Sequence, residues 1–173
     1  MKDTLIIIGL ALVAVIAGSF IFLYGRGSLS NASSSAVTYG AQTASAATVP
    51  FTELAQGARS TVSVRANYLI TSEAQLVKLW KMIDARGQAP VVDFTKNDVI
   101  AVFAGKKPTA GYAVAVSKVE DTNTREVTVA LTSPGGNCVL AQSITEPYQV
   151  IELQKTTLAL THVDQEITAS CLR

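Results

Sequence analysis

Val99-Ile100-Ala101-Val102-Phe103-Ala104 is a continuous apolar run of strand length, bounded by Asp98 and Gly105. A strand that buries one face alternates apolar and polar residues, whereas a strand that is apolar throughout is covered on both faces. The run therefore predicts a central strand with packing partners on either side of its sheet. The rest of the fold is expected to assemble around it.

A helix is predicted before this run. Ser72 and Gln75 have the spacing of the N-cap and N3 residues of a capping box, and apolar residues then recur at helical spacing. These apolar positions are Leu76, Leu79, Trp80 and Ile83. We expect the helix to end near Arg86-Gly87, since Pro90 bars its continuation.

The other predicted elements are strands. Apolar and polar residues alternate from Thr61 to Ile70, and in the segment from Glu126 to Leu131 the apolar residues again share one face. Strands are expected at 61–70, 112–119, 126–131, 148–153 and 157–163, with a short last strand through Ile167 toward Cys171. One helix packed on a mostly antiparallel sheet gives an α+β domain, sandwich-like or barrel-like.

The N-terminal part of the chain predicts a membrane anchor and a tether. The uncharged run from Leu5 to Leu23 spans roughly 28 Å as a helix, close to the roughly 30 Å of bilayer hydrocarbon. A cleaved signal would have a shorter run and a nearer cleavage site than Ala44-Ser45-Ala46. We expect a short segment at 1–4, a single transmembrane helix at 5–24, a flexible Ser/Ala-rich linker at 25–50 and the folded domain at 51–173.

The charge balance narrows the partners of this domain. The chain has a formal net charge of +1, and Lys106-Lys107 is its only adjacent pair of basic residues. Nucleic-acid affinity depends on phosphate contacts from a basic surface, so we expect no nucleic-acid partner. We also expect no metal, no cofactor and no small-molecule substrate, because neither zinc-site spacing nor a carboxylate pair is present.

Cys138 and Cys171 are the two cysteines of the chain. Outside the cytoplasm they predict a disulfide that ties the C-terminal strand to a Gly-rich loop, worth roughly 3 to 4 kcal/mol on the chain-entropy model. The alternative is a catalytic thiolate at Cys138 or Cys171, activated by His162. His162 shares its predicted strand face with apolar residues, so a structural histidine is the preferred interpretation. We therefore expect no catalytic residues.

Three loops rich in Gly and Pro carry the remaining signal, at 105–112, 133–138 and 145–149. Glycines at the ends of the first loop permit backbone angles closed to other residues, and Pro108 stiffens its tip. Rigid loops of this kind suit protein binding. The candidate partner-binding residues are Lys106, Lys107, Pro108, Thr109, Gly111, Tyr112, Gly135, Gly136, Pro147 and Tyr148.

These loops resemble the C-terminal domain of PrcB-type protease-complex subunits. The matching features are Gly-x-Lys-Pro-Thr-x-Gly-Tyr at 105–112, Ser-Pro-Gly-x-x-Cys at 133–138, and the stretch from Gln142 through Pro147-Tyr148 into an apolar strand. Ala110 stands where the family pattern leads us to expect Gly. The resemblance covers Val99 to Leu153 and implies a noncatalytic protein-binding module in the bacterial envelope, associated with a protease.

Chagasin-type inhibitors of cysteine proteases show a second resemblance. These immunoglobulin-like sandwiches present three loops in an order that Lys107 to Tyr112, Pro134 to Asn137 and Glu146 to Tyr148 echo. The predicted helix has no counterpart in that fold. We therefore expect a single-pass membrane protein with its domain outside the cytoplasm, which binds an envelope protein such as a protease; peptidase inhibition is the alternative.

Overall fold

The computed structural model describes residues 45–83 and 85–170, which fall in the compact unit Ala41–Arg173. The predicted segment at 1–4, the predicted transmembrane helix and most of the predicted linker lie outside the described residues. Within the described ranges, no helix is long and apolar enough to cross a membrane.

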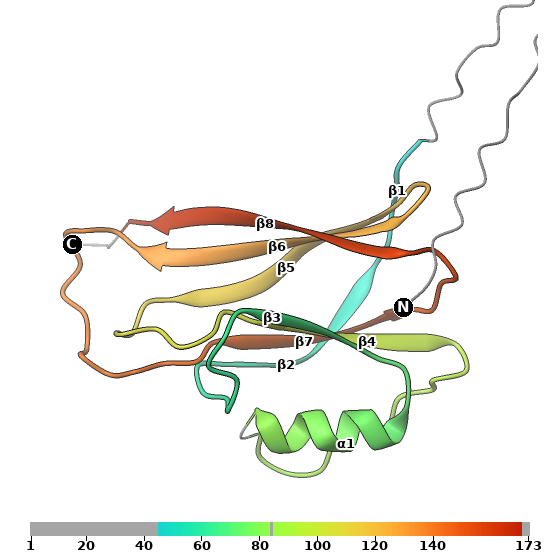
Figure 1. The fold of residues 1–173 in the computed structure, drawn as a ribbon, viewed down its shortest axis with the longest axis horizontal. Coiled ribbons are helices and arrows are strands. Elements are labelled where there is room, and N and C mark those ends of the chain that lie inside the picture. Colours follow the sequence, from blue (N-terminus) through green and yellow to red (C-terminus); the bar gives the residue numbers. More distant parts are fainter. Residues whose placement is uncertain (1–44, 84, 171–173) are drawn as a thin grey trace, which may run out of the picture. The chain divides into compact units, whose positions relative to one another are not determined.

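Two four-stranded sheets and one helix form three layers (Figure 1). The outer sheet has the strand order β1-β5-β6-β8, and the central sheet, between the outer sheet and the helix, has the order β2-β7-β4-β3. The elements are β1 (Ala47–Thr48), β2 (Phe51–Gly57), β3 (Ala66–Ile70), α1 (Glu73–Met82), β4 (Asn97–Phe103), β5 (Ala113–Asp121), β6 (Arg125–Pro134), β7 (Tyr148–Gln154) and β8 (Leu160–Ala169).

The prediction of a central strand covered on both faces is confirmed. Val99, Ala101 and Phe103 of β4 belong to the core between the central sheet and α1, whereas Ile100 and Val102 belong to the core between the two sheets. None of these five side chains is more than 3% exposed. The apolar run therefore serves two cores at once, which explains why it does not alternate with polar residues.

The helix forms where it was predicted, but its ends differ in detail. Ser72 is the N-cap without a side-chain hydrogen bond, and Gln75 Oε1 instead accepts a hydrogen bond of 2.8 Å from the backbone N–H of Thr71. At the other end, the carbonyl of Met82 accepts a hydrogen bond of 2.7 Å from the N–H of Thr61. The helix consequently ends before the predicted Arg86-Gly87.

The sheet architecture corrects the prediction of one helix on one sheet. The molecule is mainly β, with one helix and two mostly antiparallel sheets. The segments predicted as a strand at 157–163 and a further short strand form a single strand, β8, which pairs with β6 in parallel. This parallel pairing joins segments distant in sequence, so no local pattern shows it.

Two boundaries also differ from the prediction. The linker was expected to reach residue 50, yet Ala47–Thr48 form β1 on β5, and Val49 is only 8% exposed in the core between the sheets. The strand predicted at 61–70 begins only at Ala66, and Val64 is 67% exposed rather than inward-facing. In addition, β2 at Phe51–Gly57 was not predicted.

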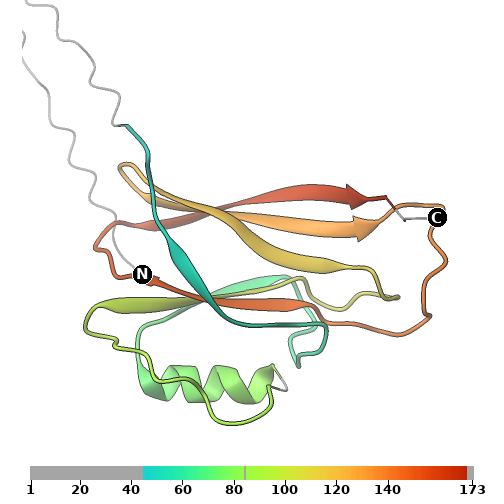
Figure 2. The same cartoon turned by 180° about the vertical axis from the view of Figure 1, so that it is seen from behind.

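The two sides of the sandwich differ. At one side β1 leads directly into β2, so the chain itself passes from the outer sheet to the central sheet and closes that side (Figure 2). At the other side the edge strands are β8 and β3, which are far apart in the sequence. That side has no connecting strand among the described residues.

Candidate functional site at the loop end

Two connections gather at one end of the sandwich (at the left in Figure 1). Residues 104–112 join β4 to β5, and residues 135–147 join β6 to β7. The second and third predicted loops, at 133–138 and 145–149, therefore lie at the two ends of one long connection. We call the exposed surface of both connections the loop-end surface.

Backbone hydrogen bonds hold the two connections side by side. The N–H of Lys107 donates to the carbonyl of Thr145 at 2.8 Å, and the N–H of Thr145 donates back at 3.1 Å. The Thr145 hydroxyl donates to the carbonyl of Thr109, and the N–H of Ala110 donates to the carbonyl of Ala141, both at 3.1 Å. This network links the two connections through their backbones and restricts the loop conformation.

Glycine is required at both ends of the first connection. Gly105 has a φ of 75°, and a Cβ there would lie 2.8 Å from the backbone carbon of Val64. Gly111 has a φ of 89°, and a Cβ there would lie 3.2 Å from the Cβ of Pro134. A side chain at either position would combine an unfavourable backbone conformation with close contacts.

The first connection carries most of the accessible candidate residues. Lys106, Pro108 and Gly111 are exposed, as is Gly136 in the second connection, whereas Lys107, Thr109, Tyr112 and Gly135 are partly buried. The ammonium of Lys107 lies 5.5 Å from the ring centroid of Tyr112, which is within cation–π distance. Tyr112 also lines a pocket of about 280 Å³ beside Gln56 and Ala58.

Pro147 and Tyr148 were predicted as partner contacts, but both are buried. The Pro147 carbonyl accepts a hydrogen bond from the N–H of Ala104 at 2.9 Å. The Tyr148 ring lies 6.3 Å from that of Phe103 and covers Gly57, where a Cβ would come within 2.8 Å of the tyrosine oxygen. These two residues therefore pack against β4 and Gly57 beneath the loops and are not accessible to a partner.

The most exposed apolar residues at this end were not among the predicted partner contacts. Val139 is 104% exposed and Ile144 is 55% exposed, both in the connection from β6 to β7. Apolar residues in a loop, without strand or helix periodicity, were the available signal. They add apolar contact area to the loop-end surface.

The region around Cys138 fits the predicted tie to the C-terminal strand. The N–H of Cys138 donates to the Gly135 carbonyl at 3.1 Å, and the N–H of Gly135 donates to the carbonyl of Ala169 at 2.9 Å. Cys138 is not a free cysteine. Cys171 lies outside the described residues, so the disulfide between them stays a prediction.

The alternative Cys138–His162 nucleophile is not assembled. Cys138 lies just beyond the end of β6, whereas His162 is in register with Val127 near the start of that strand. Pro134 lies seven residue steps along the strand from Val127, which is roughly 23 Å at about 3.3 Å per residue. A thiolate and its base must be within hydrogen-bond reach.

In the described part of the chain, no group of three or more His, Cys, Asp or Glu residues could hold a metal ion.

Comparison with known families gives one match. Residues 99–154 match the family model described as PrcB C-terminal. The match runs from β4 through both loop connections to the end of β7, and it spans about a third of the chain. No curated protein and no solved structure matches the chain. The predicted resemblance is thus confirmed over the residues that carried it.

Proposed function

We propose that this protein is a membrane-anchored, extracytoplasmic binding module that acts as a noncatalytic subunit or partner of an envelope protease. The apolar run at 5–24 supports the anchor. The PrcB C-terminal match at 99–154 supports the envelope setting and the association with a protease. The loop-end surface is the proposed contact region.

The observation that carries the proposal is the backbone bridge between Lys107 and Thr145. It fixes two exposed connections in one conformation before any partner arrives. A binding surface that is already ordered loses little conformational entropy on association, so more of the contact energy appears as affinity. Exposed Pro108, Val139 and Ile144 give this surface apolar contacts of the kind that interfaces use.

The test is crosslinking in native membranes with the full-length chain, followed by identification of the attached protein. Val139→Asp introduces a charge on the loop-end surface and should reduce capture of the protease about tenfold or more. Val91→Asp is the matched control, because Val91 is 101% exposed but lies in the connection between α1 and β4. Equal capture by both variants would refute the loop-end assignment.

Peptidase inhibition is the second candidate function. It is favoured by the convergence of the loops at one end of a two-sheet sandwich, which is the way an inhibitor presents loops to a cleft. The two candidates differ in the state of the bound enzyme. A subunit copurifies with a protease that remains active, whereas an inhibitor causes dose-dependent loss of papain-like activity.

A further inference from the structure

The side of the sandwich between β8 and β3 has features that the proposed loop-end function does not use. β8 is ten residues long and pairs with β6 along one edge. No described strand pairs with its other edge, and its residues from Leu160 to Thr168 are all exposed. An exposed edge of this length offers unpaired backbone N–H and C=O groups to another strand.

A slot of about 370 Å³ opens between the two sheets at this same side. Its floor includes Ile100, Val102 and Val127, each at most 3% exposed. Leu69 and Leu160 line it as well, and these remain 45% and 40% exposed. An apolar side chain placed there would be removed from water together with both leucines.

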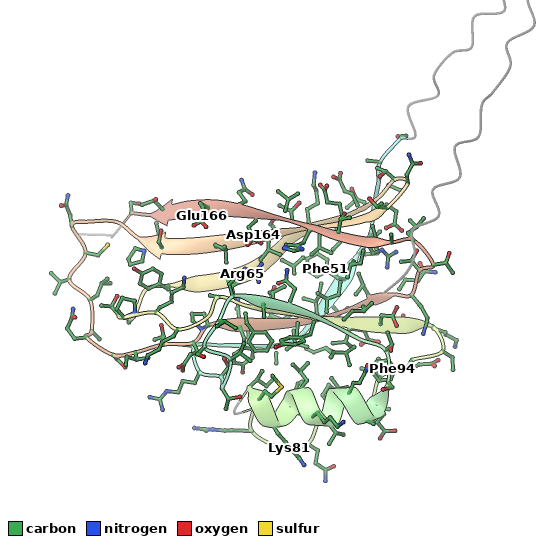
Figure 3. All side chains as sticks on the ribbon, viewed as in Figure 1. Phe51, Arg65, Lys81, Phe94, Asp164 and Glu166 are labelled. Carbon is green, nitrogen blue, oxygen red and sulfur yellow. The ribbon has the colours of Figure 1, made fainter. Side chains whose placement is uncertain are left out.

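The charges on β8 face into the sandwich rather than away from it. Asp164 and Glu166 are in register with Val129 and Leu131 of β6, which belong to or pack against the core between the sheets. Figure 3 shows both carboxylates on β8, with Arg65 reaching toward Asp164. Arg65 forms an ion pair of 2.5 Å with Asp164.

Glu166 adds a second carboxylate to this face of β8, two residues beyond the Asp164 that Arg65 pairs with. No ion pair joins it to a described Lys or Arg, and β8 itself contains neither residue type. Pairing two copies of β8 in antiparallel register would bring carboxylates together, which is unfavourable. A strand with basic residues on its inward face would instead be attracted.

We propose that the exposed edge of β8 and the adjacent slot bind an extended strand of another protein. The strand adds antiparallel to β8, with its backbone hydrogen-bonded to the free edge. Its inward-facing side chains are basic opposite Asp164 and Glu166 and apolar beside Leu160, where they enter the slot. This surface is separate from the loop-end surface, so the two can bind different segments of one partner or two different partners.

The experiment uses the full-length chain in mild detergent and a synthetic peptide, Thr-Lys-Thr-Lys-Thr-Leu-Thr-Leu-Thr. In an antiparallel arrangement, its lysines face Glu166 and Asp164 and its leucines face the slot. Binding is measured by fluorescence anisotropy and located by hydrogen exchange. We expect slower exchange of the β8 amides that point away from β6. A control peptide with Glu at both Lys positions should bind at least about tenfold more weakly.

Glu166→Lys tests whether the carboxylates of β8 select a basic strand. The Glu166 side chain is exposed, so its replacement leaves the core unchanged. The variant should bind the Lys peptide about tenfold more weakly and prefer the Glu peptide. Glu126→Lys makes the same charge change at an exposed position of β6 in the same sheet and should leave binding unchanged. Equal effects of both variants, binding without protection of β8, or no binding of the Lys peptide would each overturn the proposal.

Discussion

The side-chain amide of Gln149 in β7 accepts a hydrogen bond of 2.6 Å from the backbone N–H of Val116 in β5, and this bond joins the two sheets through the core. Gln149 is 6% exposed, and its Nε2 donates to Glu53 at 2.6 Å. The β5 ladder is irregular between Val116 and Lys118, where a bulge shifts the register. Gln149 thus supplies an acceptor inside a core that is otherwise apolar.

Replacing Gln149 with Leu should destabilise the domain by about 1–3 kcal/mol. The change removes the acceptor of the Val116 N–H and the donor to Glu53, and a buried polar group left without a partner bears its full desolvation cost. The free energy of unfolding of the full-length chain, measured by chemical denaturation, checks this expectation. Gln154→Leu is the control on the same strand, because Gln154 is exposed. A loss no larger than that of the control would contradict the proposed role of the hydrogen bond.

Replacing Gly105 with Ala should destabilise the domain by at least about 2 kcal/mol. The φ of 75° is unfavourable for alanine, and its Cβ would lie 2.8 Å from the carbon of Val64 and 2.9 Å from the nitrogen of Arg65. Both contacts are to backbone atoms, so relief requires movement of the chain. The midpoint of thermal unfolding measures the effect.

Gly87→Ala separates the two contributions to this loss. Gly87 has a φ of 86°, but a Cβ at Gly87 would have no atom within 4 Å. The control therefore retains the backbone strain and lacks the clash, and it should cost about 1 kcal/mol. If both variants lose the same stability, the close approach of Gly105 to residues 63–65 is not important.

The sequence could predict the elements whose signals are local. The continuous apolar run of β4, the helical spacing of Leu76 and Leu79 and the alternation of Val127 and Val129 each indicate burial from local sequence. These residues are buried, whereas Trp80 is only partly buried. The division into two sheets could not be predicted in this way, because it depends on which strands pair. β8 illustrates the difficulty, since three consecutive inward positions, His162, Asp164 and Glu166, are polar or charged rather than apolar.

The candidate site was predictable to a similar extent. Gly and Pro marked the connections correctly, but their contact through Lys107 and Thr145 could not be predicted, because it depends on strand order. Burial of Tyr148 was not predictable, because a tyrosine that follows Pro at the start of a strand can face either way. Val139 and Ile144 were missed since exposed apolar residues in a loop have no periodic signal.

Acid should weaken the hairpin formed by β5 and β6. Arg125 is 4% exposed and donates two hydrogen bonds of 2.7 Å to Asp121. These hydrogen bonds, with the charge of Arg125, lower the pKa of Asp121 below its ordinary value of 3.8, although partial burial opposes the shift. A lowered pKa in the folded state means that the ion pair stabilises the protein above pH 3.8. That stability is lost as the pH falls through the lower, folded-state pKa.

Asp121→Asn tests this ion pair. At neutral pH it should cost about 1–2 kcal/mol, because it leaves the buried Arg125 uncompensated while the Asp121 side chain is itself one quarter exposed. The variant should also show a smaller loss of stability below pH 3.8 than the wild type. Glu126→Gln removes an exposed carboxylate from the same hairpin and should change the neutral-pH stability by less than about 0.5 kcal/mol. If the free energy of unfolding falls equally with decreasing pH in the wild type and in Asp121→Asn, the Asp121–Arg125 ion pair is not the cause of the acid sensitivity.

The predicted disulfide can be tested in the same chain. If Cys138 is bonded to Cys171, alkylation of denatured, unreduced protein should label no thiol, and labelling should follow reduction. Cys138→Ser should lower the free energy of unfolding by roughly 3 kcal/mol, and reduction should lower that of the wild type equally. Reduction should have no further effect on Cys138→Ser, which is its own control. Two alkylatable thiols in protein isolated from the envelope would contradict the disulfide and weaken the placement of the domain outside the cytoplasm, since bonded cysteines are typical of oxidising compartments.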